Sequence, residues 1–267
     1  MTPIELRADS LERFSKIEAS LRQEWDTGIV LPWFRGQADA RWSLEPRFHR
    51  MRPRDDTFET EYEMREEFAI RARGLLGVKP TDDWDWYVLM QHHGAATRLL
   101  DWTEGALLGL YFAVRDHKGN HDAAVWALDP WWLNRLIIRK GDVIPVGDPG
   151  VSAHDASRVK RWLPERFPQR TARLPQYPVA VYPTHFVSRI GAQRSCFTVH
   201  GRQNGFEGIR ERKPRLRKIV IPVASVSRIR KGLEASGIDD STVYPDLDGL
   251  GRAVTTKWLE EPRFVRD

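Results

Sequence analysis

The sequence lacks the features that mark secreted, membrane-spanning and zinc-binding proteins. It contains a single cysteine, Cys196, which excludes an internal disulfide and any zinc site built from several cysteines. It has no amino-terminal apolar leader, and no stretch approaches the roughly 18 apolar residues that a membrane span requires. It also lacks an HExxH spacing. We therefore expect a soluble, cytoplasmic protein with no membrane partner and no bound metal.

Composition and charge are those of a globular protein. Hydrophobic residues make up 41% of the 267-residue chain and charged residues 30%, a balance that excludes wholesale disorder. The net charge of +5 is a mild basic bias, which permits a nucleic-acid partner without requiring one. The chain shows no internal repeat. We expect one domain over residues 1–267, with its core at about 10–255 and an irregular, Pro-, Gly- and Arg-rich insertion at about 142–176.

Apolar periodicity predicts a mixture of helices and strands. Helical spacing predicts helices over residues 9–25, 57–76, 83–93, 103–116, 226–235 and a last one ending near 259, with a helix or turn at 131–138. Runs rich in β-branched and aromatic residues predict strands over residues 29–35, 97–102, 123–128, 179–182, 196–200 and 216–222. Asp9 and Glu12 have capping-box spacing, and Pro46 favours an extended segment at 42–50. Without strict alternation of helix and strand, we expect an α+β fold with a mixed or antiparallel central sheet flanked by helices.

Three stretches combine polar side chains and apolar flanks more densely than a core segment requires. The central one, Leu89–Val114, contains two adjacent histidines, a Gly, an Arg, an Asp and a Trp before an apolar, helix-like tail. The second is Trp33–Gln37, with the sequence WFRGQ, and the third runs from Arg189 to His200. We expect these segments, which are distant in sequence, to converge within one cleft.

Several of these residues also have a purely structural interpretation. Arg98 and Asp101 are three residues apart and could simply pair with each other. Arg35 could be a buried cation that is paired with a carboxylate. His92 and His93 cannot both point the same way on a helix, so we expect one to cap the helix or fill the core while the other reaches the site.

The sequence resembles the FRG-domain family of bacterial and phage proteins. The family is named after the motif that stands here as Phe34–Gly36. The likeness continues through positions spread over most of the chain: Gln37, Trp42, Pro46, Arg50, Gln91–Gly94, Thr97–Thr103, Leu110–Ala113, Arg189–Ile190, Ala192–Gln193, Phe197–His200 and Pro245–Asp248. The resemblance implies a role as a toxin or phage-defence effector, from the kinds of genome that the family inhabits. It implies no particular reaction.

A second resemblance suggests a reaction. ADP-ribosyltransferases of the arginine–serine–glutamate type carry, in order, an aromatic-Arg-Gly strand end, a Ser-Thr-Ser strand end followed by a helix, and a Glu-x-Glu strand. Here Trp33–Gly36 is similar to the first motif, and Asp101–Ala113 is similar to the second with its serines altered. Gln193 occupies the place of the third. This resemblance implies an ADP-ribosyltransferase-like fold and NAD, or a related nucleotide, as the cofactor.

The chemistry of the side chains and the resemblance together assign roles within the site. Arg35, beside Gly36 at a strand end, can make paired charge-assisted bonds to a pyrophosphate, and the glycine allows close backbone approach to a ligand. Thr103, as the N-cap of the next helix, can hold a ribose or position the strand. The expected catalytic residues are Arg35, His93, Asp101 and Gln193. The expected cofactor-binding residues are Arg35, Gly36, Gln37, His92, Arg98, Thr103, Tyr111, Arg189 and His200.

The third motif departs from the transferase pattern. Gln193 is neutral where the transferases have glutamate, and losing such an electrostatic contribution commonly costs ~100- to 1000-fold in rate. Asp101, Asp246 or Asp248 could supply the acid instead. Two other functions stay open. One is a nucleic-acid-binding domain without turnover, and the other is a metal-independent nuclease that uses the His92/His93 pair.

Overall fold

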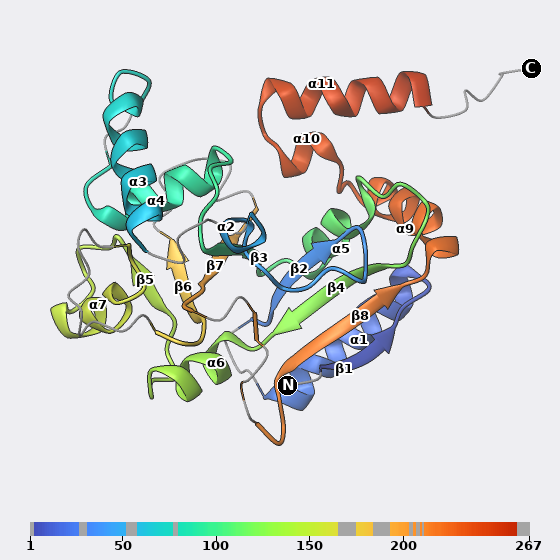
Figure 1. The fold of residues 1–267 in the computed structure, drawn as a ribbon. Helices are drawn as coiled ribbons and strands as arrows, with labels where there is room; N and C mark the ends of the chain where they lie inside the picture. Colours follow the sequence, from blue (N-terminus) through green and yellow to red (C-terminus); the bar gives the residue numbers. More distant parts are fainter. Residues whose placement is uncertain are drawn as a thin grey trace, which may run out of the picture.

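A mixed sheet lies at the centre of the protein (Figure 1). The computed structural model describes residues 3–26, 31–51, 58–76, 80–164, 175–183, 193–202, 205–206, 209 and 211–260. Across the sheet, the strands are β1 (Ile4–Arg7), β8 (Leu216–Ile221), β4 (Ala123–Leu128), β2 (Trp33–Gln37), β3 (Leu99–Thr103), β7 (Ser195–Val199), β6 (Val179–Pro183) and β5 (Ile144–Val146). The β1–β8 and β5–β6 pairs are parallel, and the other pairs are antiparallel. With helices on its faces, this sheet confirms the α+β prediction.

The sheet consists of two halves that meet at a single residue pair. β2 pairs with β4 along its whole length, and β3 pairs with β7 along its whole length. Between β2 and β3, by contrast, Phe34 and Thr103 are the one pair in register within the described chain. Beyond this pair the ladder is not formed. We call the resulting opening between Arg35–Gln37 and Leu99–Trp102 the split.

Helices cover both halves of the sheet. The first half is covered by α1 (Leu11–Trp25), α5 (Ala106–Val114) and α9 (Val223–Ala235). The second half is covered by α4 (Asp83–His92), which α3 (Phe58–Ala72) adjoins, and by α7 (Ala153–Lys160). Side chains alternate along each strand, so Trp33, Trp102 and Trp126 point to the opposite face, where α6 (Pro130–Ile137) packs. No helix in the described part of the chain is long and apolar enough to cross a membrane.

Two glycines let α5 lie directly on β2. A Cβ at Gly36 would come within 2.2 Å of the carbonyl oxygen of Gly109 and within 2.3 Å of the backbone nitrogen of Ala113. A Cβ at Gly109 would come within 2.7 Å of the Cβ of Phe34. Neither contact leaves room for a side chain, because backbone atoms cannot move aside as a flexible side chain can. The close backbone approach predicted for Gly36 is therefore real, but the neighbour is α5 rather than a ligand.

The starts of two helices differ from the prediction. Ser10, not Asp9, caps α1, and its hydroxyl accepts a hydrogen bond from the backbone N–H of Arg13. The segment expected to be extended ends in a short helix, α2 (Arg47–Arg50). Pro46 precedes this helix as its cap, a position where a missing N–H does no harm, so the proline starts the helix instead of preventing it.

Further corrections concern α5 and the predicted insertion. The N-cap of α5 is Gly105, not Thr103. The described part of residues 142–176 contains β5 and α7, so it is more regular than expected, whereas residues 165–174 lie outside the described residues. The sequence reading also missed β1 and α10 (Asp240–Val243). The final predicted helix is present as α11 (Leu247–Thr255), followed by a π-helical turn (Thr256–Glu260).

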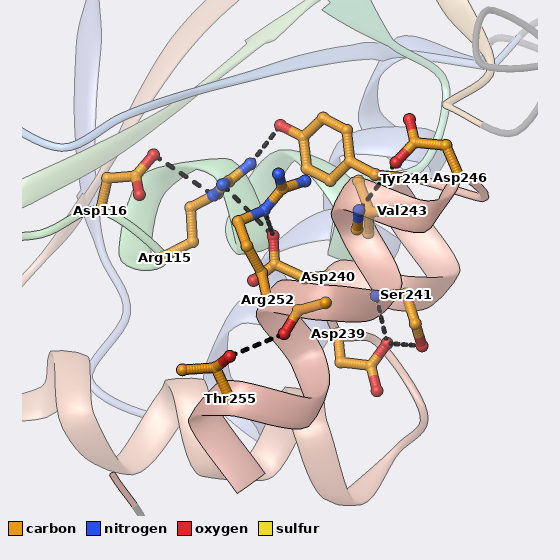
Figure 2. Close-up of polar contacts among 12 residues, drawn as sticks. Arg115, Asp116, Asp239, Asp240, Ser241, Val243, Tyr244, Asp246, Arg252 and Thr255 are labelled. Atoms are coloured by element: carbon orange, nitrogen blue, oxygen red, sulfur yellow. Dashed lines mark hydrogen bonds and ion pairs between the residues drawn. The ribbon is translucent and has the colours of Figure 1, made fainter. Parts of the chain in front are cut away.

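A polar cluster fastens α10 and α11 to the end of α5 (Figure 2). The Oδ1 of Asp240 lies 3.3 Å from the Nη2 of Arg115 and accepts a hydrogen bond of 3.1 Å from the Nε of Arg252. Arg115 also donates to the hydroxyl of Tyr244. The Cζ atoms of Arg115 and Arg252 lie 4.7 and 4.9 Å from the centre of the Tyr244 ring. The cluster fixes α10 beside the carboxyl end of α5.

Candidate functional site

Arg35 spans the split between the two halves of the sheet. Its Nη1 donates a 2.8 Å hydrogen bond to the backbone carbonyl of Asp101, in the region where the β2–β3 ladder is missing. Its Nε is buried and has no hydrogen-bond partner among the described residues. Burial lowers the pKa of Arg35, and the negative charge of Asp101 offsets part of this effect. Buried polar groups are rarely left without a partner, so an open guanidinium edge is a donor available to a ligand.

One side of Arg35 faces a cavity of about 290 Å³, which we call the aromatic cavity. Aromatic residues and a few polar groups line it, the combination typical of small-molecule sites. The lining residues are Phe34, Arg35, Gly36, Asp101, Trp102, Thr103, Phe112, Gln193 and Ser195. These residues come from all three of the polar stretches, so the predicted convergence in one cleft is observed.

Another side of Arg35 faces a smaller cavity of about 160 Å³, which we call the arginine hollow. Three arginines and a carboxylate line it together with backbone and apolar groups. Its lining residues are Arg35, Arg47, Arg50, Gln91, Gly94, Ala95, Leu99, Leu100 and Asp101. Because Arg35 and Asp101 border both cavities, the two form adjoining parts of one site.

Asp101 is held at the junction of the two cavities. Its Oδ2 accepts a 2.7 Å hydrogen bond from the side-chain amide of Gln91 and lies 3.8 Å from the Nη1 of Arg35. The side-chain oxygen of Gln91 in turn accepts from the hydroxyl of Thr97, so the amide cannot rotate freely. Desolvation raises the pKa of Asp101, although Arg35 and then Gln91 lower it in part. The carboxyl group keeps 55% of its side-chain surface exposed, so it remains accessible to a ligand.

Thr103 and Gln193 form the far wall of the aromatic cavity. The Thr103 hydroxyl donates to the backbone carbonyl of Gln193 at 2.7 Å and accepts from the N–H of Gly105 at 3.0 Å. The Gln193 amide nitrogen lies 3.3 Å from the carbonyl oxygen of Val243 in α10, to which it donates. Thr103 therefore positions this wall of the cavity, which is the structural one of the two roles expected for it. Gln193 retains its amide oxygen and a second N–H for a ligand.

Arg98 is a core cation and not a ligand-binding residue, which corrects the sequence prediction. It is 3% exposed, and its Nε donates to Glu61 at 2.5 Å. Its Nη1 and Nη2 donate to the carbonyl oxygens of His200 and Trp162, at 2.6 and 2.5 Å. Glu61 is fully buried and also accepts from the hydroxyl of Tyr87. The predicted pairing of Arg98 with Asp101 is also wrong, because α3 supplies the partner.

The side chain of Gln37 is likewise structural. Its amide nitrogen donates to the carbonyl of Ser43 at 3.0 Å, and its amide oxygen accepts from the indole N–H of Trp126 at 2.7 Å. The side chain is buried and borders neither cavity. Gln37 points to the same face as Trp33, where α6 packs, and its amide is used there by Ser43 and Trp126.

The histidines lie away from the two cavities. His93 ends α4 and borders a separate cavity between α3 and α4, while His92 makes an edge-on contact with the ring of His93, with 5.0 Å between their centroids. His200 is buried beside Thr198 and Phe206. No group of three metal-ligating side chains occurs among the described residues. The structure therefore brings none of these three histidines to Arg35.

Two further predicted residues are placed as follows. Tyr111 is buried between α5 and the α10 region and borders neither cavity, whereas its neighbour Phe112 lines the aromatic cavity. Arg189 lies outside the described residues. Several lining residues were missing from the prediction, among them Arg47, Arg50, Gln91 and Phe112. Arg50, Gln91 and Phe112 stand in segments that carry the family likeness, and Arg47 stands one turn of helix before Arg50, so a signal existed for each of these four.

Comparison with known proteins identifies one family. Residues 32–122 match the family model of the FRG domain. This segment holds β2, β3 and α5, and it contains Arg35, Asp101 and the arginines of α2. The resemblance to the FRG-domain family is thus confirmed for residues 32–122. No curated protein and no solved structure matches the chain.

Proposed function

We propose that the split binds NAD or a related nucleotide and that the protein acts as an ADP-ribosyltransferase-like enzyme. The observation that carries the proposal is the position of Arg35, a partly buried cation whose Nε has no partner among the described residues and which lies between an aromatic cavity and a hollow lined by further arginines. Phosphates are bound by guanidinium groups through paired charge-assisted bonds, and bases stack on aromatic rings. A nucleotide supplies both kinds of group in one molecule, and the two cavities adjoin at Arg35 and Asp101.

Each wall of the site suggests a part of the nucleotide. Phe112 offers ring surface for a base, and Gln193 and Ser195 offer polar atoms for a ribose. Arg35 is placed for the phosphate that follows. Asp101, with its raised pKa and exposed carboxyl group, is the acidic residue among those that line the aromatic cavity, so we assign it the acid role in the reaction at the glycosidic bond. Gln193 remains neutral, so we expect any transfer reaction to be slow.

Calorimetric titration with NAD, performed beside gel shifts with RNA and DNA, tests the proposal. Binding in the micromolar to millimolar range that Arg35→Ala weakens would support the nucleotide site. A protein that ignores NAD but binds RNA or DNA with a steep salt dependence would instead be a nucleic-acid-binding module. The arginines of the hollow favour this second candidate, because arginines also contact the phosphates of nucleic acids.

The proposed biological role, a toxin or phage-defence effector, depends on the same site. Expression of the wild-type chain in bacterial cells should then slow growth or limit phage infection. Arg35→Ala, expressed at the same level, should remove the effect, whereas Arg13→Ala on α1 should keep it because Arg13 is exposed and borders neither cavity. Equal behaviour of all three chains would contradict the role.

A further inference from the structure

The arginine hollow contains donors that the contacts within the described chain leave unused. Arg50 is exposed, and its guanidinium has no hydrogen bond or ion pair recorded within the described residues. Arg47 uses Nη1 to donate to the carbonyl oxygen of Gly94 at 2.7 Å, which leaves its other N–H groups open. Residues three apart on a helix project to the same side, so α2 presents both guanidinium groups to the hollow.

The charges around the hollow favour an anion. Three arginines and one aspartate border it, and three positive charges less one negative charge leave +2. The positive charge of Arg50 acts on both Arg35 and Asp101. It adds to the lowering of the Arg35 pKa that burial causes, and it offsets part of the rise in the Asp101 pKa that desolvation causes. Like charges so close together in a partly desolvated place repel one another, and a bound anion relieves that repulsion.

The size of the hollow limits what the anion can be. Its volume of about 160 Å³ corresponds to roughly five water molecules at about 30 Å³ each. This space suits one phosphate group with part of its hydration shell and is too small for a nucleoside. The base and ribose therefore belong in the aromatic cavity of about 290 Å³ on the other side of Arg35.

We propose that the arginine hollow binds the second phosphate of a pyrophosphate whose first phosphate contacts Arg35. The ligand class is then a pyrophosphate-bearing nucleotide, distinguished from nucleotides with a single phosphate. This inference rests on the proposed nucleotide site and adds the residues that select the phosphate chain. Arg35 contacts both phosphates or their bridge, while Arg47 and Arg50 contact the distal one.

The test compares ligands that differ by one phosphate. Affinities are measured by calorimetry for ADP against AMP, NAD against nicotinamide mononucleotide, and inorganic pyrophosphate against orthophosphate. The variants are Arg50→Ala and Arg47→Ala, with Arg13→Ala on α1 as a control that removes the same charge from an exposed place far along the sequence. Thermal melting checks each variant, and Arg50→Ala is the cleaner one because Arg50 holds no recorded side-chain contact in the described chain.

For the wild type, we expect ADP to bind at least about 10-fold more tightly than AMP, and pyrophosphate at least about 10-fold more tightly than orthophosphate. This is the effect of one added charge-assisted contact. Arg50→Ala should remove most of this ratio while changing AMP affinity by less than about 3-fold, and Arg13→Ala should leave the ratio unchanged. Arg35→Ala should weaken AMP and ADP alike.

The outcomes separate this inference from the proposed function. If NAD binds through Arg35 but neither Arg47→Ala nor Arg50→Ala alters the ADP-to-AMP ratio, the hollow is not a phosphate subsite and the inference fails alone. If pyrophosphate binds in a manner that depends on Arg50 and no nucleotide binds more tightly than pyrophosphate, the hollow stands and the nucleotide proposal fails. Equal affinities for one-phosphate and two-phosphate ligands in the wild type would overturn the inference directly.

Discussion

Two arginines that flank β3 show how differently the same side chain is used in two regions of this protein. Arg98, at the start of β3, is enclosed by Glu61 and two backbone carbonyls, which satisfy its Nε and both terminal nitrogens. Arg35, across the split, has one hydrogen bond to a carbonyl and a buried Nε without a partner in the described chain. In the first region every guanidinium nitrogen is paired, and the ion pair holds α3 to the sheet. In the second region the guanidinium keeps a donor without a partner in the described chain.

The difference teaches that burial of an arginine says little about its role until its donors are counted. Both arginines stand in dense polar motifs, and both are largely withdrawn from water. A buried ion with every donor paired is structural, because a ligand would have to break existing bonds to reach it. A buried ion with unpaired donors in a cavity wall can bind a ligand without breaking existing bonds. The following experiments test this contrast, from the largest expected effect to the smallest.

Glu61→Ala should give the largest loss of stability. It leaves Arg98 as an unpaired charge in the core, a change that typically costs 3 to 5 kcal/mol, here expected at about 4 kcal/mol. Urea denaturation measures the difference in free energy of unfolding. Glu59→Ala is the matched control, because Glu59 is exposed on the same helix and should change stability by less than about 0.5 kcal/mol. Equal effects of the two variants would mean that the Arg98 cluster is not a closed structural ion pair.

Gly36→Ala should destabilise the side of the split that belongs to β2. The new methyl group would overlap backbone atoms of Gly109 and Ala113, so β2 and α5 would have to separate, at a cost of about 1 to 3 kcal/mol or more. Gly251→Ala serves as the control, since Gly251 lies in α11 with open space around it and should be neutral or stabilising by about 0.4 to 1 kcal/mol. If Gly36→Ala melts at the wild-type temperature, the tight α5–β2 contact described above is wrong.

Arg35→Ala should change ligand affinity far more than stability. The fold loses one hydrogen bond to a carbonyl, worth about 1 kcal/mol, whereas a ligand loses charge-assisted bonds worth about 1.5 to 3 kcal/mol, or roughly 10- to 150-fold in affinity. Thermal melting without ligand and calorimetry with NAD measure the two effects. A drop in stability as large as that of Glu61→Ala would show that Arg35 is a structural cation after all.

Asp101→Asn should have the smallest effect and a defined pH dependence. The pKa of Asp101 is raised in the folded protein, so its contribution to stability is fully present below its unfolded pKa of about 3.9 and is lost as the pH rises through the folded value. The asparagine variant should therefore gain on the wild type as the pH rises above about 4. The gain should stay below about 1 kcal/mol because the carboxyl is half exposed. Denaturation at pH 4 and pH 7 measures it, and a variant that loses ground with rising pH would contradict the assigned shift.

The sequence predicted which segments meet but not which of their side chains face the meeting point. The polar density of Trp33–Gln37, the β3 region and Gln193 was enough to place Arg35, Asp101 and Gln193 in one cleft. Periodicity also located most helices and strands, because apolar spacing determines which face of an element is buried. Neither polar density nor periodicity indicates whether an arginine forms an ion pair with a carboxylate from a distant part of the chain. Glu61 lies 37 residues before Arg98 and on a different element, α3.

The arginine hollow escaped prediction for a different reason. Pro46 was taken to favour an extended segment at 42–50, whereas it caps the start of a helix, and only the helical turn puts Arg47 and Arg50 on the same side. The two histidines were favoured because they stand in the central polar stretch, Leu89–Val114, yet the end of α4 turns His93 toward α3. Such orientations depend on where a helix starts or stops to within one residue, which is the least certain part of any sequence reading.

The single residue pair between β2 and β3 should also be visible in the rates at which backbone amides exchange with deuterium. Amides inside each half of the sheet are protected by continuous ladders, so they should exchange through openings of that half alone, as separate cooperative units. The β2 and β3 amides that face the split have no strand partner beyond Phe34 and Thr103, and they should label early. A ligand that bridges the split would join the two units, and the protection it confers would reach strands that it never touches.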